Sequence, residues 1–188
     1  MRVVSGIYKG RRFDVSHSFK ARPTTDFAKE NLFNVLGNLI DFNDQVHALD
    51  LFAGTGSISL ELLSRGCEQV VSIEKDREHY TYICKVMKEL GNPAWLPLKA
   101  DVFKFISRCN EQFDLVFADP PYALKELASL PDLIFEHNLL KPDGLFILEH
   151  GKDHQFDQHP YFMQHRKYGA VNFTLFKPTV KAVETLIG

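Results

Sequence analysis

Short apolar runs alternate with segments of helical spacing along most of this chain. Runs that favour strands lie at residues 46–52, 69–73, 95–100, 113–118 and 145–149. Nearly continuous apolar strands between helices are typical of a parallel sheet that helices cover on both faces. Because crossovers between parallel strands are right-handed, we expect a doubly wound, mostly parallel α/β sheet. Ligands of such sheets bind beyond the carboxyl ends of the strands.

Helical patterns fill the gaps between these strands and precede the first of them. One of residues 24–26 can cap a helix that starts after Pro23. The tripeptide Pro-Asp-Gly at residues 142–144 predicts a turn before the last core strand. Further helices are expected at residues 57–64, 77–90, 102–108 and 130–137.

Both ends of the chain carry hairpin signals. Residues 2–5 and 11–15 are strand-like and enclose two glycines, which predicts an N-terminal hairpin or arm. Residues 162–168 and 171–176, with Gly169 between them, predict an antiparallel hairpin after the core.

Positive charge is concentrated near the N-terminus. The chain has 22 Lys and Arg against 24 Asp and Glu, yet residues 1–22 carry six basic side chains and one acidic one. A basic segment on an acidic body predicts contact with a polyanion, and the alternative is a solvated edge that prevents aggregation. The residues expected to make this contact are Arg2, Lys9, Arg11 and Arg12.

Composition excludes several classes of protein. Hydrophobic residues make up 45% and charged residues 24%, the balance of a globular domain and not of a disordered chain. No apolar run approaches the roughly 18 residues that span a membrane, and the first residues lack the apolar segment of a secretory signal. The three cysteines lie far apart without a C-x-x-C pair, so we expect the cytoplasm, no disulfide and no metal site. The sequence does not set the oligomeric state, and a monomer is the default expectation.

A glycine loop follows the first core strand. Residues 50–57 read D-L-F-A-G-T-G-S, so a strand feeds a tight turn that opens a helix. Gly54 and Gly56 leave no side chain between the backbone and a ligand. Ser59 stands where a dinucleotide fingerprint has its third glycine, and no lysine follows as in a P-loop. The loop alone is also compatible with a plain strand-to-helix turn.

Acidic residues mark the ends of neighbouring strands. Glu74 ends the second core strand and can accept from both hydroxyls of a ribose. Asp101 follows the third strand and can accept from an adenine amine, while Val102 or Phe103 offers the ring an apolar face. Asp50 can orient the glycine loop or meet an ammonium group. Each acid alone is more simply a helix cap or a solvated carboxylate, but together they outline a nucleoside-shaped site.

The run Asp119-Pro120-Pro121-Tyr122 directly after the fourth core strand is the strongest chemical signal in the chain. Two prolines fix two φ angles and remove two N–H donors, so the loop is rigid and rich in acceptors. Asp119 and the Pro120 carbonyl can accept hydrogen bonds from the two N–H groups of an exocyclic amine, and Tyr122 can stack on the base. The loop therefore predicts a site for a planar base with an amine, and the alternative is a proline-rich turn.

These features together resemble a known family. The run D-L-F-A-G-T-G, Glu74, Asp101 and D-P-P-Y resemble the class I S-adenosylmethionine-dependent methyltransferases that modify exocyclic amines of bases. The wider pattern, from M-R-V-V-S-G-x-x-x-G-R-R through R-P-T-T-D to Tyr168-Gly169, resembles the RsmD family, which methylates the N2 amine of one guanine in 16S ribosomal RNA. The resemblance implies a seven-stranded Rossmann-like sheet, S-adenosylmethionine as cofactor and the small ribosomal subunit as partner.

The resemblance also assigns residues and boundaries. It implies that Phe52, within the glycine-loop run, belongs to the cofactor site, and that Arg22, Pro23 and Thr24 lie near the methionyl end of the cofactor or the target base. It covers residues 1–177. The expected parts are a basic hairpin or arm at residues 1–22, the methyltransferase domain at residues 23–177 and an extension without an assigned role at residues 178–188.

Several alternatives remain open from the sequence. An adenine-N6 or cytosine-N4 methyltransferase would use the same D-P-P-Y chemistry, although 188 residues leave little room for a domain that reads DNA sequence. A non-catalytic nucleotide- or RNA-binding module is a second alternative. A nicotinamide-dependent oxidoreductase is a third, against which Ser59 and the two prolines count. His150 and His154 have metal-ligand spacing, but solvated or capping roles are the simpler interpretation.

Overall fold

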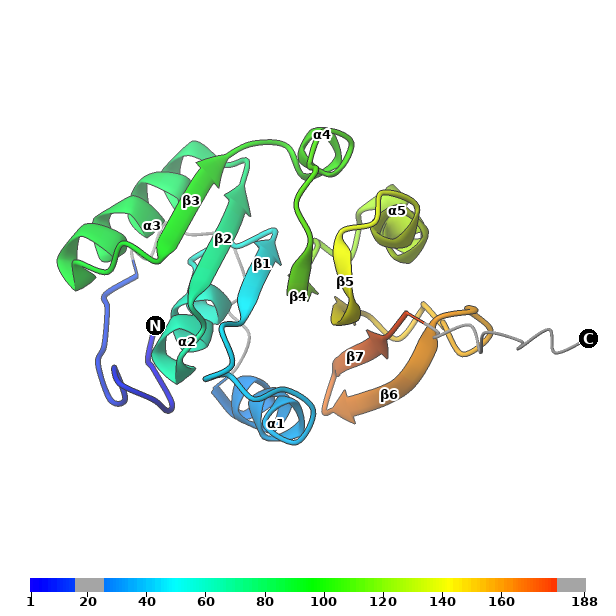
Figure 1. Cartoon of the computed structure of the whole chain (residues 1–188), viewed down its shortest axis with the longest axis horizontal. Coiled ribbons are helices and arrows are strands. Elements are labelled where there is room, and N and C mark those ends of the chain that lie inside the picture. The colour runs from blue at the N-terminus through cyan, green and yellow to red at the C-terminus, as the bar shows by residue number, and fades with distance from the viewer. Residues whose placement is uncertain (16–25, 179–188) are drawn as a thin grey trace, which may run out of the picture.

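One sheet of seven strands runs through the described part of the chain, which is residues 1–15 and 26–178 of a computed structural model (Figure 1). Its spatial order is β3-β2-β1-β4-β5-β7-β6. β1 to β5 pair in parallel, whereas β7 runs antiparallel to β5 and β6. The predicted doubly wound sheet with a terminal hairpin is confirmed. The strands span β1 His47–Leu51, β2 Gln69–Glu74, β3 Trp95–Lys99, β4 Phe113–Ala118, β5 Leu140–His150, β6 Phe162–Tyr168 and β7 Val171–Phe176.

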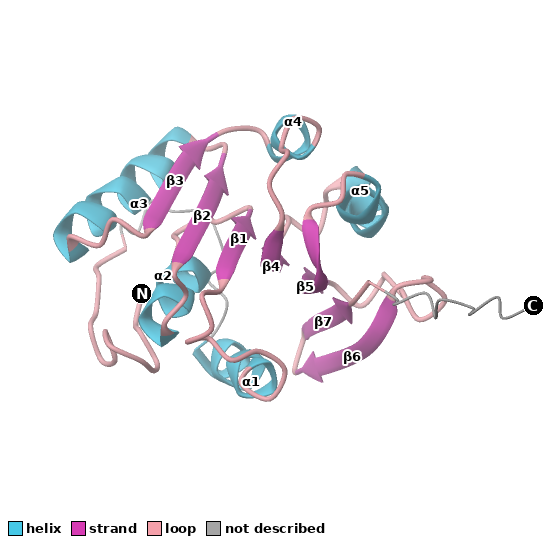
Figure 2. Cartoon of the chain, viewed as in Figure 1, coloured by secondary structure: helices cyan, strands magenta, loops and turns pink. Residues whose placement is uncertain are grey.

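Helices cover both faces of this sheet (Figure 2). One apolar cluster joins α1, α2 and α3 to one face, and a second joins α4 and α5 to the other. Leu49 of β1 belongs to the second cluster and its neighbour Ala48 to the first, so both sides of the strand are buried, which explains its continuous apolar run. The helices span α1 Asp26–Leu36, α2 Ser57–Arg65, α3 Arg77–Leu90, α4 Val102–Ile106, the 3₁₀ helix η1 Lys125–Ser129 and α5 Leu130–Glu136. None of the helices in residues 1–15 and 26–178 has the length and apolar character needed to cross a membrane.

The parallel strands end at one edge of the sheet, which we call the carboxyl edge. Ala118 at the end of β4 pairs in register with Leu51 at the end of β1. Because β7 is antiparallel to β5, its beginning lies beside the end of β5, and Asn172 pairs with His150. Gly169 closes the β6–β7 turn with a φ of +63°, which glycine adopts without strain. The loops after β1 and β4 and the turn of the terminal hairpin therefore share the carboxyl edge.

The predicted turn at residues 142–144 is wrong. These residues lie inside β5, and the register of β5 against β4 shifts between Phe113 and Leu115. The irregularity needs Gly144, because a Cβ there would lie 2.8 Å from the Phe113 carbonyl oxygen. A Pro-Asp-Gly sequence accommodates a bulge as readily as a turn, so the sequence alone does not separate the two.

The N-terminal hairpin is present, but its two predicted strands reduce to a single bridge between Arg2 and Arg12. Around this bridge the Val3 amide donates to the Arg11 carbonyl and the Phe13 amide to the Met1 carbonyl, and past Val3 a buried carboxylate on α2 takes the amides. Glu61 accepts from the amide of Val4 through Oε2 (2.8 Å) and from the amide of Ser5 through Oε1 (3.0 Å). These two amides therefore bond to a side chain of the core, and the hairpin is fastened to α2.

A buried lysine on α1 reaches the same place. Lys29 Nζ donates to the Arg2 carbonyl at 2.6 Å and to Ser57 Oγ at 3.1 Å, and it lies 3.8 Å from Glu61 Oε2. The side chains of Lys29 and Glu61 are both at most 1% exposed, and burial lowers the pKa of Lys29. The hairpin, α1 and α2 are thus joined by one buried ion pair.

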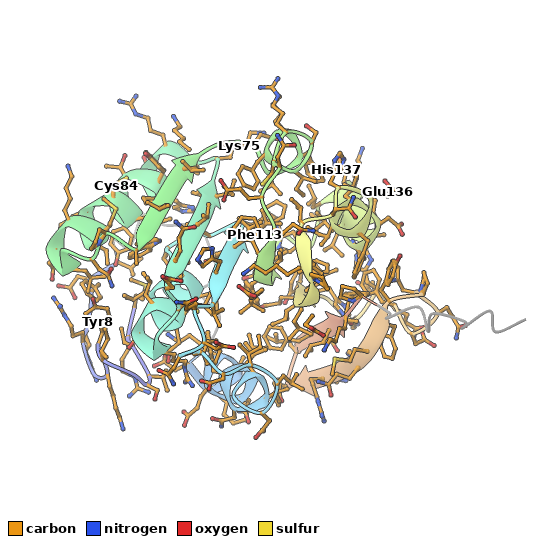
Figure 3. The ribbon with its side chains drawn as sticks, in the orientation of Figure 1. Tyr8, Lys75, Cys84, Phe113, Glu136 and His137 are labelled. Carbon is orange, nitrogen blue, oxygen red and sulfur yellow. The ribbon has the colours of Figure 1, made fainter. Side chains whose placement is uncertain are left out.

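The tip of the hairpin packs at the end of α2. The Ile7 amide donates to the Ser64 carbonyl at 2.7 Å, and a Cβ at Gly6 would overlap that carbonyl. The Tyr8 hydroxyl accepts from the side chain of Asn92, just beyond α3, and Figure 3 shows Tyr8 at this side of the molecule. Since α2 runs away from the glycine loop, the tip lies toward the edge opposite the carboxyl edge.

Candidate active site

The glycine loop after β1 is held by the end of β2. The Gly54 amide donates to Glu74 Oε2 at 2.7 Å. Phe52, the first residue after β1, has a φ of +62°, which is uncommon for a residue with a side chain. Its ring meets the ring of Phe103 edge-on, with centroids 6.4 Å apart. An aromatic pair therefore lies at the carboxyl edge beside the loop.

The two glycines of the loop have different roles. Both have left-handed φ angles, +55° at Gly54 and +74° at Gly56. A Cβ on Gly56 would lie 2.7 Å from Trp95 Cζ2 and 3.2 Å from Ile83, so this glycine permits packing against the core. A Cβ on Gly54 would meet nothing nearer than the Phe52 carbonyl oxygen at 3.9 Å. Only Gly54 faces the open space that the predicted ligand approach requires.

Asp50 lies beneath the loop and is 1% exposed. Its Oδ2 accepts from both the amide and the hydroxyl of Ser59, at the start of α2. The Ser59 hydroxyl lies 2.6 Å from Ser72 Oγ, which accepts from Trp95 Nε1 at 2.7 Å. Burial raises the pKa of Asp50 to about 7, and the hydrogen bonds from Ser59 oppose the rise. This geometry fits the first of the two predicted roles, orientation of the loop.

Glu74 stands at the end of β2, where it was expected. Besides accepting from Gly54, it accepts from the Asp76 amide through Oε1 at 2.7 Å. The residue is 8% exposed. A carboxylate offers about four lone-pair sites, so two backbone amides leave acceptor capacity for the predicted contact with ribose hydroxyls.

Asp101 stands two residues beyond β3 and caps α4. Its Oδ1 accepts from the Lys104 amide at 3.3 Å, and its Oδ2 accepts from Lys75 Nζ at 2.9 Å. Figure 3 shows Lys75 near the ends of β2 and β3. The hydrogen bond from Lys75 lowers the pKa of Asp101. Of the two residues expected to offer an apolar face, Val102 is buried in the core and Phe103 is partly exposed.

The Asp-Pro-Pro-Tyr loop follows β4 without a break. Because Ala118 pairs with Leu51, the loop starts on the strand next to the one that carries the glycine loop, about 4.8 Å away. Asp119 is partly exposed, Pro120 is buried, and Pro121 is exposed, with its carbonyl accepting from the Leu124 amide at 2.8 Å. The structure therefore brings the two predicted motifs side by side at the carboxyl edge.

Tyr122 is anchored at its hydroxyl and exposed at its ring. The hydroxyl donates to Glu149 Oε1 at 3.0 Å, while the residue as a whole is 44% exposed. A Cβ on Gly151 would lie 3.3 Å from the ring, so the backbone after β5 supports one face of the tyrosine. An exposed ring with a fixed tip is suited to stacking on a planar ligand.

Glu149 is a candidate site residue that sequence reasoning missed. It lies near the end of β5 and is 4% exposed. The sequence carried a signal for it, because Glu149 is an acidic residue at the end of an apolar run, the same position from which Glu74 was predicted. Applying the same rule to the fifth strand would have found it.

Other predicted site residues lie elsewhere. Arg22 and Thr24 fall outside the described residues. Arg2 pairs with Asp26 at 3.0 Å, and Arg11 lies 3.6 Å from Glu89 with its guanidinium over the rings of the hairpin. Lys9 and Arg12 are exposed. Arg2 and Arg12 face each other at the open end of the hairpin, where Lys29 binds both the Arg2 carbonyl and Ser57 at the start of α2. Lys9 lies near the tip, toward the opposite edge.

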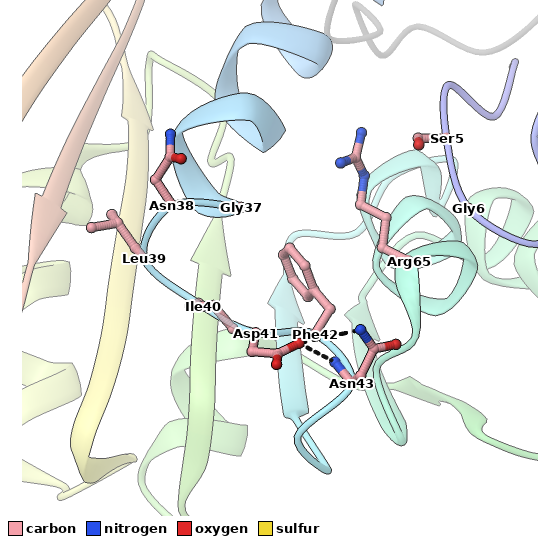
Figure 4. A pocket seen from close by; sticks show the side chains of 10 residues that line it. All are labelled: Ser5, Gly6, Gly37, Asn38, Leu39, Ile40, Asp41, Phe42, Asn43 and Arg65. Atoms are coloured by element: carbon pink, nitrogen blue, oxygen red, sulfur yellow. Dashed lines mark hydrogen bonds between the residues drawn. The ribbon is translucent and has the colours of Figure 1, made fainter.

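One cavity of the surface lies apart from this site. A cavity of about 650 Å³ is lined by residues 37–43 with Ser5, Gly6 and Arg65 (Figure 4). It lies between the end of α1 and the start of β1, at the edge opposite the loops. Within the described residues, no group of three or more His, Cys, Asp or Glu is arranged to hold a metal ion.

Comparisons with known proteins agree with this geometry. A family model described as "Conserved hypothetical protein 95" matches residues 1–177. Ribosomal RNA small subunit methyltransferase D of Haemophilus influenzae is 34% identical over 160 residues, which cover 81% of this chain and 80% of that protein. A solved hypothetical protein of Thermus thermophilus is 29% identical with a TM-score of 0.81, covering 94% of this chain and 99% of its own. An RNA methyltransferase of Salinibacter ruber, solved in complex with S-adenosyl-L-homocysteine, shares the fold at 17% identity and a TM-score of 0.65, covering 89% of this chain and 100% of its own.

Proposed function

This chain belongs to the family described as Conserved hypothetical protein 95, the RsmD family, and we propose that it transfers a methyl group from S-adenosylmethionine to ribosomal RNA of the small subunit. The finer proposal is that the acceptor is the exocyclic N2 amine of a guanine in 16S ribosomal RNA. The observation that carries methyl transfer to an exocyclic amine is the Asp-Pro-Pro-Tyr loop, which lies beside the glycine loop on adjacent strands. The choice of guanine rests on the resemblance to the RsmD family.

The residues at the carboxyl edge fit S-adenosylmethionine. The space above Gly54 is open. Glu74 and Asp101 supply acceptors at the ends of neighbouring strands, and the rings of Phe52 and Phe103 supply an aromatic surface. When bound, the cofactor supplies a methyl group on a positively charged sulfur. We propose that Arg22 and Thr24, outside the described residues, complete the site near the methionyl end or the target base.

Asp119 and Pro120 position the acceptor amine in this proposal. The lone pair of an exocyclic amine is delocalised into the ring, so the nitrogen is a poor nucleophile and must be held accurately. The Asp119 carboxylate and the Pro120 carbonyl each accept a hydrogen bond from one N–H group of the amine. Such positioning lowers the reaction barrier by about 7–11 kcal/mol in favourable cases. Asp119 then accepts, directly or through water, the proton that the nitrogen loses when it gains the methyl group.

The RNA must present its base from outside a helix. A base inside a duplex cannot reach a pocket beside Asp119, so the target is looped out or flipped, and the exposed ring of Tyr122 is placed to stack on it. The basic hairpin adds contacts with phosphates, which strengthen binding without reading sequence.

Methyl transfer to unmodified small ribosomal subunits tests the proposal. The protein is incubated with methyl-labelled S-adenosylmethionine, the RNA is digested, and the labelled nucleoside and its position are identified by mass spectrometry. We expect N2-methylguanosine at one position. N6-methyladenosine would retain the chemistry of the Asp-Pro-Pro-Tyr loop and reject guanine. Absence of label, with the cofactor bound, would reject methyl transfer to this RNA.

The variant Asp119→Ala separates catalysis from cofactor binding. It removes the acceptor for the amine but leaves Gly54, Glu74 and Asp101 in place. We expect cofactor binding like that of the wild type and a loss of turnover of about 10²- to 10⁴-fold. Asp44→Ala, an exposed carboxylate in the loop before β1, is the matched control and should change neither quantity. Turnover near the wild-type level in Asp119→Ala would refute this role.

A further inference from the structure

Glu149 brings a second carboxylate to the base-binding side of the carboxyl edge. β4 and β5 are parallel neighbours, and Ala118, the last residue of β4, pairs with Leu148. Asp119 and Glu149 are therefore the next residues along two adjacent strands, whose backbones lie about 4.8 Å apart. At 4% exposure, Glu149 holds its carboxylate in a nearly enclosed position next to the residue proposed to bind the amine.

The contacts of Glu149 tie it to the Asp-Pro-Pro-Tyr loop. Leu148 belongs to the core cluster under α4 and α5, so the alternation of a strand directs Glu149 toward the opposite face of the sheet. Its register partner on β7, Phe173, belongs to the cluster on that face. The Tyr122 hydroxyl reaches across and donates to Glu149 Oε1 at 3.0 Å. The carboxylate thus lies within reach of the ring proposed to stack on the base.

The chemistry of the bases decides what a carboxylate in this place can recognise. Guanine carries a hydrogen on N1, directly beside its N2 amine. Adenine and cytosine have an unprotonated ring nitrogen, a hydrogen-bond acceptor, beside their amines. An ionised carboxylate only accepts hydrogen bonds, so it attracts the N1–H of guanine and repels the ring nitrogens of the other two.

We propose that Glu149 determines the specificity for guanine by accepting a hydrogen bond from the N1–H group while Asp119 holds the N2 amine. The inference rests on the proposed function and names the residue that would select its base. The hydrogen bond from Tyr122 fixes one oxygen of Glu149 and so orients the carboxylate. A site built to form a hydrogen bond rejects an analogue without the matching group far more strongly than a pocket that selects by shape.

A base analogue removes the N1–H contact. 2,6-Diaminopurine keeps the 2-amine of guanine, but its ring N1 has no hydrogen and an amine replaces O6, so the Glu149 variant below is needed to assign the effect to N1. Small subunits are assembled with a synthetic RNA segment that carries guanosine or 2,6-diaminopurine at the position found in the labelling experiment, and the two rates of methylation are compared. We expect the wild type to prefer guanosine by at least about tenfold. Equal rates for the two bases would overturn the proposal without any variant.

The variant Glu149→Gln tests whether Glu149 is the residue that reads N1. A glutamine amide can accept from N1–H or donate to an unprotonated N1, and it still accepts from the Tyr122 hydroxyl. We expect the preference for guanosine to fall to within about threefold. Glu111→Gln, an exposed residue just before β4, is the matched control and should keep the wild-type preference.

The outcomes separate the inference from the proposed function. If Glu149 only held Tyr122 in place, Glu149→Gln would keep the wild-type preference, because glutamine preserves that hydrogen bond, and the proposal would be wrong. A wild type that methylates neither base would overturn the proposed function and this inference with it. If Glu149→Gln does not fold, Glu149→Asp is the second variant: it keeps a carboxylate but draws it back from the base, so the preference for guanosine should again fall, and an unchanged preference would overturn the proposal.

Discussion

Asp50 is a carboxyl group with almost no access to solvent and a chain of hydrogen bonds directed toward it. Trp95 can only donate, so the hydroxyl hydrogens of Ser72 and Ser59 are free to point along the chain to Asp50. Burial still dominates and raises the pKa of Asp50 to about 7. Because the unfolded value is 3.8, the unfolded chain loses this proton first as the pH rises. Folding stability from this group is therefore full below about pH 4 and is lost as the pH rises through 7.

Asp50→Asn should remove this pH dependence, since asparagine resembles the protonated acid. We expect the free energy of unfolding of the variant, minus that of the wild type, to increase by about 3 kcal/mol between pH 5 and pH 8. Chemical denaturation at several pH values measures it, and Asp44→Asn provides the exposed control. Parallel curves for Asp50→Asn and the wild type would show that Asp50 is ionised throughout.

Site residues could be predicted from the sequence where they follow directly on the end of an apolar strand. Glu74, Asp101 and Asp119 follow apolar runs, and the carboxyl ends of parallel strands meet at one edge, so their grouping follows from the fold class. The partners of Lys29 and Glu61 could not be inferred in this way. They lie 32 positions apart on two helices, and no periodic pattern links a buried lysine to the backbone of a distant hairpin.

At the scale of elements, the turn from β1 into α2 depends on two glycines that should respond differently to substitution. Gly56→Ala combines a left-handed φ with a Cβ 2.7 Å from Trp95, whereas Gly54→Ala adds only the backbone strain. We expect a loss of about 2–4 kcal/mol of unfolding free energy for Gly56→Ala and about 1–2 kcal/mol for Gly54→Ala. Trp95 is the sole tryptophan, so its fluorescence during denaturation measures the unfolding free energy of both variants. Equal losses would mean that the Trp95 contact relaxes.

The hairpin, α1 and α2 should come apart when their common carboxylate is removed. Glu61→Ala leaves two hairpin amides without their acceptor and the buried charge of Lys29 without its carboxylate. We expect a loss of about 3–5 kcal/mol and faster hydrogen exchange at Val4 and Ser5. Glu68→Ala, which breaks an exposed pair with His47, should lose at most about 1 kcal/mol. Similar losses in the two variants would contradict the account of the buried ion pair.

Most elements were predictable because apolar periodicity and terminal glycines agree. α3 and β4 have the expected boundaries, and Gly66 ends α2 in a left-handed conformation. The exceptions are places where a residue distant in sequence contacts or hydrogen-bonds the backbone. Glu61 binds the amides of Val4 and Ser5, so the pairing of the hairpin ends at Val3. The Phe113 carbonyl lies against Gly144, and residues 142–144 belong to β5 and not to a turn.

Over the whole molecule, charge is divided between an acidic body and a basic hairpin. The tip of the hairpin lies along α2, about 14 Å from the glycine loop by the length of that helix, so a phosphate bound there belongs to RNA well outside the site. Lys9 lies near this tip, whereas Arg12 lies at the open end of the hairpin, across from Arg2. If Lys9 and Arg12 each neutralise one phosphate, replacing both by alanine should lower the slope of log affinity against log salt by about 1.4–1.8.

Binding of ribosomal RNA at several salt concentrations checks this expectation. Lys85→Ala, an exposed change on the outer side of α3, is the control and should leave the slope unaltered. A double variant with the wild-type slope would assign the phosphate contacts to another surface, and the hairpin would then have a structural role only.

The strand order also bears on how the chain assembles as it is synthesised. β1 is the first strand of the sheet to be made, yet it takes an internal place between β2 and β4, and Asp50 pairs with Phe117 far along the sequence. One side of β1 therefore stays open while the whole β2–α3–β3–α4 segment is added. Contacts of such long sequence separation form slowly and leave strand edges exposed in the interval. The glycine loop is made early, but the loop that faces it arrives only with β4, so the nascent chain carries half of its site before the other half exists.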